Sequence, residues 1–148
     1  MIFRPLLGDW LHYDTSIAEV ATFAEKIYLN HDLGGFTGDP QFVADTWAQK
    51  AFSKLRSSIA GNYSWRMNHA RTPDEKKRMA QEADFAFRQA FALCPTSSEA
   101  LYRYVNLLVS LNRADDARLL TETSLELDPK NAQVQSLLEQ LKKSPRER

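Results

Sequence analysis

The sequence has a single cysteine, Cys94, among its 148 residues. One cysteine excludes an internal disulfide framework and any zinc site built from several cysteines. Because no activating base is recognisable, we interpret Cys94 as a packed, inert thiol. An excess of charge is also lacking, since Lys plus Arg and Asp plus Glu both number 19; we therefore expect no nucleic-acid partner. Apolar runs fall far short of the ~20 residues that span a bilayer, so no transmembrane segment is expected.

Catalytic and metal-binding motifs are lacking as well. His12 and Asp14 are spaced too closely for one helical face. The same holds for His31 and Asp32, and nothing fixes one pair relative to the other. The glycine-rich segment Gly34–Gly38 follows an expected helix instead of a strand, and no Lys-Ser/Thr pair follows it, which favours a connecting loop over a phosphate site. We therefore predict no catalytic residue, no metal, no cofactor and no enzymatic activity.

The sequence does contain enough apolar residues for one packed domain, with 43% hydrophobic and 26% charged residues. Its C-terminal half repeats, because Ala83–Pro95 resembles Ala117–Pro129 and the matching residues stand 34 positions apart. The matching pairs are Ala83 and Ala117, Ala90 and Ser124, Phe91 and Leu125, Leu93 and Leu127, and Pro95 and Pro129. A period of 34 residues is typical of the tetratricopeptide repeat family, which this chain resembles. The best copy is Ser98–Asn131.

The physical pattern of that copy predicts two packed helices. The first has one apolar face, formed at three- and four-residue steps by Leu101, Tyr104, Val105, Leu108 and Leu111. Asn112 is expected to end it in a left-handed conformation. The small residues Ala117 and Ser124 let the second helix approach closely, and Pro129 ends the pair. The chain departs from the family at Val105, where a glycine is common, and at Thr121, where an aromatic residue is usual.

An earlier copy is expected before this one. Thr72 caps its second helix, with Pro73 at the first position and Glu75 completing a capping box. The same box is expected at Thr96 for the following helix. The first helix of the earlier copy is expected over Ser57–Ala70.

The N-terminal residues 1–56 are expected to add a helical pair. Ser16 and Glu19 form a capping box before the first helix of this pair. Asp39 and Pro40 are expected to open the second helix. Its expected apolar side consists of Phe42, Val43, Trp47, Ala51, Phe52 and Leu55. We expect the pair to pack onto the repeats as an extra hairpin, because two repeats and a cap bury too little surface alone.

The chain is expected to close with a capping helix over Ala132–Lys143. Gln135 and Glu139 stand where an internal repeat would be apolar, so this helix has the polar outer face of a cap. Residues 144–148 are expected to form a frayed tail. The predicted fold is all-α, a TPR-like helical hairpin stack (an α-α superhelix) in a single domain over residues 1–148. We divide it into the segment 1–56, the repeats 57–131 and the cap 132–143.

The resemblance also implies a binding face. In the family, the first helix of each repeat lines a concave groove. In the clear copy this places five residues in the groove: Glu99, Tyr102, Arg103, Asn106 and Val109. Tyr102 and Arg103 are typical interface anchors, and the amide of Asn106 suits a peptide backbone. Tyr102 stands where chaperone-binding members carry a lysine, so the predicted partner is a protein or peptide of another kind.

Two further functions stay open. The segments Arg56–Arg66 and Ala83–Leu108, with the opening FRPLLGDWLHYDT, are similar to the soluble C-terminal region of a bacterial multi-span membrane family resembling protein O-mannosyltransferases. That resemblance implies a soluble accessory domain of a membrane glycosyltransferase. The sequence leaves the compartment open between the cytoplasm and the soluble tail of a membrane protein. The other function is a self-associating structural domain, a homodimer built on Trp10, Trp47 or Trp65.

Basic residues cluster in the middle of the chain. The cluster consists of Lys50, Lys54, Arg56, Arg66, Arg71, Lys76, Lys77 and Arg78, with few acidic residues between them. The simplest interpretation is a set of solvated helix faces. The alternative is contact with an acidic partner or with lipid head groups, whose affinity would fall as salt rises.

Overall fold

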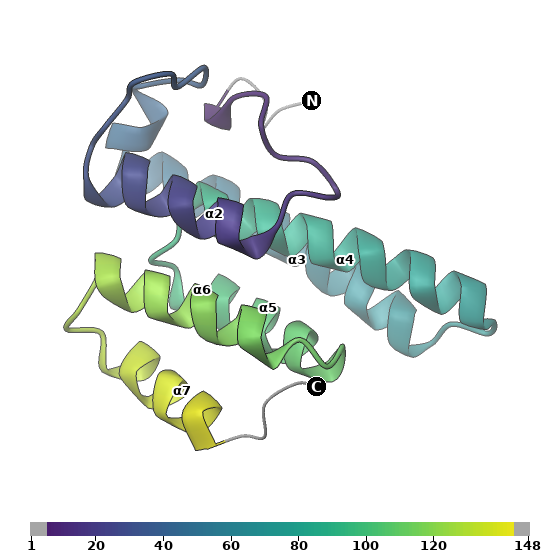
Figure 1. The fold of residues 1–148 in the computed structure, drawn as a ribbon. Coiled ribbons are helices and arrows are strands. Elements are labelled where there is room, and N and C mark those ends of the chain that lie inside the picture. The colour runs from purple at the N-terminus through teal and green to yellow at the C-terminus, as the bar shows by residue number, and fades with distance from the viewer. Residues whose placement is uncertain (1–5, 144–148) are drawn as a thin grey trace.

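The computed structural model describes residues 6–143 and shows helices and loops without a strand in that range (Figure 1). The helices are α2 (Ile17–Ala24), the π-helix η1 (Glu25–Leu29), the 3₁₀-helix η2 (Phe42–Ala44), α3 (Thr46–Asn68), α4 (Pro73–Leu93), α5 (Ser98–Ser110), α6 (Ala114–Leu127) and α7 (Ala132–Lys143). The all-α hairpin stack is thereby confirmed. The tail expected at 144–148 lies outside the described residues, as do residues 1–5.

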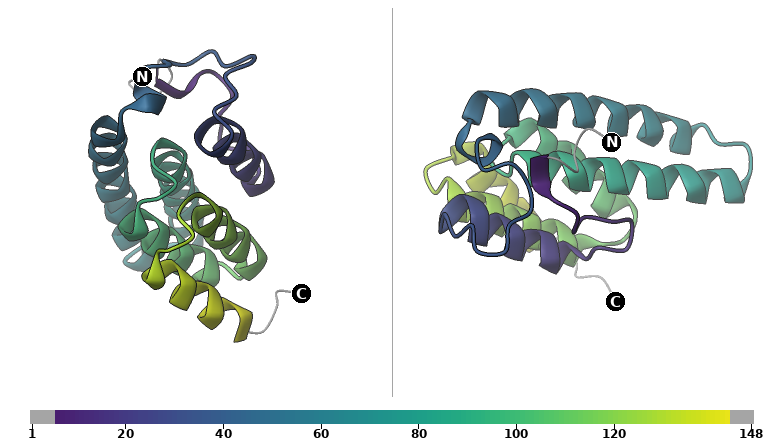
Figure 2. Two further views of the ribbon diagram at one scale, coloured as in Figure 1. Left: turned by 90° about the vertical axis from the view of Figure 1, so that its left-hand side faces the viewer. Right: turned by 90° about the horizontal axis from the view of Figure 1, so that it is seen from above.

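The helices form two consecutive hairpins, α3 with α4 and α5 with α6, followed by α7. Helices α3, α5 and α7 follow one another along one side of the molecule and form a first layer (Figure 2, left). Helices α4 and α6 form a second layer beside it. Helix α2 packs on this second layer, against both α4 and α6. The far ends of α3 and α4 project beyond the other helices (Figure 2, right).

The sequence prediction for residues 39–70 is wrong in two respects. Asp39 and Pro40 open only a short turn, which leads into η2. Helix α3 begins after Asp45, whose carboxylate accepts a hydrogen bond from the backbone N–H of Ala48. It then continues without a break through the boundary that we placed at residue 56. A single helix therefore replaces the second helix of the expected N-terminal pair and the expected helix Ser57–Ala70.

The buried face of α3 is also different from the predicted one. Trp47 is 86% exposed and Leu55 is 50% exposed. Its buried residues are Gln49, Ser53, Ser57, Ala60 and Met67, and the first four of these are small or polar. The hydroxyl of Ser53 donates to the carbonyl of Ala90 at 2.7 Å, so the two helices approach each other closely here. The positions of the apolar residues in the sequence did not predict this face. Short side chains permit close helix packing even where they are not hydrophobic.

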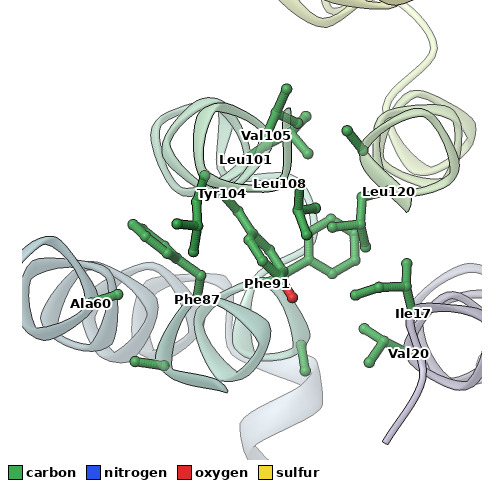
Figure 3. Packing of buried hydrophobic residues seen from close by; sticks show 14 of the residues in the cluster. Ile17, Val20, Ala60, Phe87, Phe91, Leu101, Tyr104, Val105, Leu108 and Leu120 are labelled. Atoms are coloured by element: carbon green, nitrogen blue, oxygen red, sulfur yellow. The ribbon is translucent and has the colours of Figure 1, made fainter. Parts of the chain in front are cut away.

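The core joins the N-terminal helix to the repeats. Phe91 of α4 and Leu120 of α6 point toward Ile17 and Val20 of α2, as Figure 3 shows. All four side chains are at least 98% buried. Burying large apolar side chains of this kind contributes roughly 1.5–3 kcal/mol each relative to leaving them exposed. Helix α2 is therefore part of the same core as the hairpins.

Most predicted helix ends are confirmed. The Ser16 and Glu19 capping box is complete. Asn112 adopts the left-handed conformation with φ of 62°. Thr72 caps α4, although the side chain of Glu75 accepts from the backbone of Arg71. One cap differs from the prediction, because α5 is capped by Ser97, one residue after Thr96.

Asp84 on α4 links three helices to the N-terminal segment. It accepts a hydrogen bond from the hydroxyl of Tyr104 on α5 at 2.6 Å. It also forms ion pairs with Arg88 on its own helix and with Arg113, which precedes α6. The guanidinium of Arg88 in turn donates to the carbonyls of His12 and Tyr13. This network fixes the order of the elements around the end of α4.

Candidate functional site

A groove of about 590 Å³ lies between α3 and α5. We call it the α3/α5 groove, and it is lined by Ser58, Gly61, Asn62, Ser64, Trp65, Phe87, Arg103 and Asn106. Two of the five residues predicted from the sequence, Arg103 and Asn106, line it. The other six were not predicted: five belong to α3, and the sixth is Phe87 of α4.

The other three predicted residues, Glu99, Tyr102 and Val109, do not line this groove. Glu99 forms an exposed ion pair with Arg103, with the charged atoms 3.5 Å apart. Val109 is exposed on the last turn of α5. Tyr102 points elsewhere, because its hydroxyl donates to the carbonyl of Gln133 on α7 at 2.8 Å. Tyr102 therefore contacts the capping helix and does not line the α3/α5 groove.

The α3 wall combines hydrogen-bonding and aromatic groups. Asn62 is exposed, and its amide offers both donors and an acceptor. Trp65 is 61% exposed and stacks on His69 with ring centroids 4.0 Å apart. A Cβ at Gly61 would lie 3.5 Å from Nη1 of Arg103, so this glycine forms part of the floor below the guanidinium. A glycine inside a long helix was the one sequence signal for this wall.

The charge along helix α3 is of one sign. Helix α3 contains four basic residues and no acidic residue. Of the four, Lys50, Lys54 and Arg66 are exposed, whereas Arg56 is half-buried and bonds to Gln89 of α4. Burial lowers the pKa of Arg56 from its usual range, although its guanidinium stays charged at neutral pH. None of these four residues lines the groove, whose one charged lining residue is Arg103 of α5; the exposed surface of α3 beside the groove is nevertheless basic in a chain of zero net charge.

A second hollow, of about 570 Å³, lies at the other end of α3. Its lining includes the apolar residues Ile27, Leu33, Pro40, Val43 and Leu127 and the polar residues His31, Thr46 and Gln49. The π-helix η1 and the left-handed His31, with φ of 55°, form one side. The amide of Gln49 donates to the carbonyl of Phe42, so the main polar group here is already used in the fold.

The glycine-rich loop beside this hollow is anchored to the rest of the structure. Gly38 approaches the backbone so closely that a Cβ would lie 2.5 Å from the carbonyl oxygen of Leu6. The next residue, Asp39, donates its N–H to that same carbonyl at 3.0 Å. The ammonium group of Lys26 donates a hydrogen bond to the carbonyl of Gly34. The loop thus packs on the N-terminal segment, and a 3₁₀-helix, not an α-helix, follows it.

Residues 6–143 contain no cluster of three or more His, Cys, Asp or Glu side chains that could hold a metal ion. Cys94 is a buried free thiol whose sulfur lies 3.7 Å from the hydroxyl of Thr96. In the same range, no helix is both long enough and apolar enough to cross a bilayer.

The hairpin geometry agrees with the comparison with known families. Residues 76–141 match the tetratricopeptide repeat family. The tetratricopeptide match begins inside α4, so it covers α5, α6 and most of α7 and leaves α3 out. Searches of curated proteins and of solved structures found no match. The resemblance to a family similar to protein O-mannosyltransferases is not supported.

Tetratricopeptide repeats generally mediate contacts between proteins, which makes a protein partner the coarse functional conclusion. The best sequence copy, Ser98–Asn131, falls wholly inside the matched segment. Its two helices correspond to α5 and α6, and α5 supplies Arg103 and Asn106 to the groove.

Proposed function

We propose that this chain is a non-enzymatic interaction module that binds a peptide segment of a partner protein in the α3/α5 groove. The observation that carries the proposal is the meeting of Asn62 and Trp65 with Arg103 and Asn106 in one hollow. The four side chains belong to two helices of one layer, so a segment lying in the groove contacts both.

The groove has the chemistry that a bound peptide segment requires. The amides of Asn62 and Asn106 can each donate and accept hydrogen bonds with polar groups of that segment. Trp65 supplies a flat apolar surface for one side chain, and Trp and Arg are the residue types enriched among interface hot spots. Glu99 holds Arg103 through an exposed ion pair, which leaves the guanidinium at the surface.

A peptide-selection experiment tests the proposal. Peptides are selected from a random displayed library on the wild-type chain, and their affinities are measured by fluorescence anisotropy. We expect Asn106→Ala and Trp65→Ala to weaken the selected peptides about tenfold, as loss of an interface anchor does. Glu122→Ala, at an exposed position on α6, is the matched control and should leave affinity unchanged. Peptides that bind all four proteins equally well would contradict the proposal.

Self-association is the second candidate, because Trp47 and Trp65 are both strongly exposed. Trp10 does not support it, since its ring stacks on Phe23 with centroids 4.4 Å apart and its N–H donates to the carbonyl of Leu7. Sedimentation over a wide range of protein concentration separates the two candidates. A dimer that dissociates in Trp47→Ala supports self-association, and a monomer at every concentration removes it.

A further inference from the structure

One exposed face of α3 carries an unusual row of side chains. We call it the α3 stripe, and it consists of Trp47, Ala51, Leu55, Ser58, Asn62 and Trp65. Successive members are three or four residues apart, so all six lie on the same face of the helix. Every one of them is exposed. Its large apolar members, Trp47, Leu55 and Trp65, are 86%, 50% and 61% exposed.

This stripe is hydrophobic where a solvated helix would be polar. Single apolar residues on a surface are ordinary, but three large ones along one helix face form a patch of the kind that marks an interaction site. The opposite face of α3 already packs on α4 through Ser53, Ser57 and Ala60. The stripe is therefore not needed for the packing of the hairpin, and the fold does not account for it.

The charges around the stripe indicate the sign of the charge that its partner carries. Lys50 and Lys54 stand next to Ala51 and Leu55 and are exposed. Helix α3 has four basic residues and no acidic one, whereas the whole chain is neutral. A surface with this local excess attracts groups of negative charge.

The shape of the surface indicates an elongated partner. Ser58, Asn62 and Trp65 belong both to the stripe and to the lining of the α3/α5 groove. Because α5 forms the other wall, the surface is a trough between two helices that can receive the side chains of a third. From Trp47 to Trp65 the stripe extends for about 27 Å at 1.5 Å per residue, which equals about five helical turns.

We propose that the α3 stripe binds an amphipathic helix of a partner protein, with an apolar face edged by acidic side chains. The apolar face covers Trp47, Leu55 and Trp65, and the acidic edge lies beside Lys50 and Lys54. This inference rests on the proposed function, because it names the partner of the same groove. It extends the site by three turns of α3 beyond the groove itself.

A designed pair of peptides tests the charge rule. Both are fluorescein-labelled, helical and about 18 residues long, the length of the stripe, with Leu on one face. One peptide has Glu along the edges of that face and the other has Lys. We expect the wild-type chain to bind the Glu peptide about tenfold or more tightly than the Lys peptide, with an affinity that falls as salt rises. Equal affinity for the two peptides, or no binding of the Glu peptide, overturns the proposal.

Variants of exposed residues then locate the site without threatening the fold. Trp47→Ala and Leu55→Ala should each weaken the Glu peptide about fivefold. Lys50→Glu combined with Lys54→Glu should abolish the preference for the Glu peptide. Lys130→Glu combined with Lys143→Glu makes the same change in net charge far along the chain, at exposed positions, and should preserve the preference. Identical behaviour of the two double variants overturns the proposal, because net charge alone would then explain binding.

Two probes cover the other occupants of a basic, tryptophan-bearing surface. These are a single-stranded oligonucleotide and a vesicle of anionic lipid. The inference is overturned if the wild-type chain binds either probe more tightly than the Glu peptide and the Lys50→Glu and Lys54→Glu double variant no longer binds that probe. If Asn106→Ala weakens library-selected peptides while Trp47→Ala and Leu55→Ala leave both peptide sets unchanged, the inference fails and the proposed function stands. If none of these variants has an effect, both fail.

Discussion

Gly61 on α3 lies directly beneath the guanidinium of Arg103 on α5, since a Cβ on Gly61 would meet Nη1 of Arg103 at 3.5 Å. That distance is an ordinary van der Waals contact. Gly61→Ala should therefore fit, and should stabilise the fold by about 0.5–1 kcal/mol, because glycine is a poor helix former. Urea unfolding measures the change.

A larger residue at the same position should act on binding. The side chain of Gly61→Met would extend into the groove below Arg103. We expect Gly61→Met to weaken groove-bound peptides while leaving the helix content unchanged by circular dichroism. Peptide binding that survives Gly61→Met intact would place the site elsewhere.

The bond between Tyr104 and Asp84 should be a main contributor to stability. Tyr104 is fully buried, and its hydroxyl donates to a carboxylate. Tyr104→Phe keeps the ring stacked on Phe87 but removes the donor. Hydrogen bonds to charged groups contribute about 1.5–3 kcal/mol, and we expect a loss of that order in chemical denaturation. The control is Tyr63→Phe, the same change at a partly buried position on α3. A loss no larger than that of the control would mean that Arg88 and Arg113 satisfy Asp84 without the phenol.

Stability should also fall at alkaline pH. Burial raises the pKa of Tyr104 well above its ordinary value, and the nearby Asp84 adds to the effect. Burial likewise raises the pKa of Tyr28. An unfolded tyrosine loses its proton near pH 10, so the stabilisation is complete below about pH 10 and is lost as the pH rises beyond it. Unfolding free energies at pH 8 and 11 should therefore differ, and by less in Tyr104→Phe.

Arg88 should hold the N-terminal segment in place. Its side chain is 4% exposed, pairs with Asp84 and donates to the carbonyls of His12 and Tyr13. Removing one member of a buried ion pair costs about 3–5 kcal/mol, which is the loss expected for Arg88→Met. Arg118→Met, at a half-exposed position on α6, is the control. Hydrogen exchange should quicken at residues 12–15 in the Arg88 variant alone.

Tyr102 should matter for the cap and not for the groove. Tyr102→Phe removes the bond to Gln133 and should cost about 0.5–1.5 kcal/mol, the usual net value of one hydrogen bond. Peptides bound to the α3/α5 groove should keep their affinity. If Tyr102→Phe weakens peptide affinity without changing the free energy of unfolding, Tyr102 is part of the binding site.

The sequence predicted the C-terminal half well because its signals are local. Three residues predicted local features of one hairpin or its cap: Asn112 the end of a helix, Ala117 a close helix contact and Gln135 a polar outer face. The period of 34 residues predicted that the hairpins repeat along the chain. The prediction that Arg103 and Asn106 lie in a groove came from the resemblance to the repeat family.

The N-terminal half was harder because its constraints are between distant segments. Trp47 and Leu55 look like core residues by composition, yet Ser53 and Ser57 form the buried face, since close approach to α4 decides the packing. Asp84 and Arg88 carried no sequence signal, because their partners are up to 76 residues away. The α3 wall of the groove was missed for the same reason.

The packing of α2 on α6 has a consequence for how the molecule unfolds. Repeat arrays are held together by neighbouring units and can lose structure from one end. In this chain Ile17 and Val20, near the beginning, share a core with Leu120, about a hundred positions later. Closing so long a loop ties the two halves into one cooperative transition. Shortening the chain at α2 should therefore weaken the distant α5–α6 hairpin, an end-to-end dependence that a linear stack of repeats does not have.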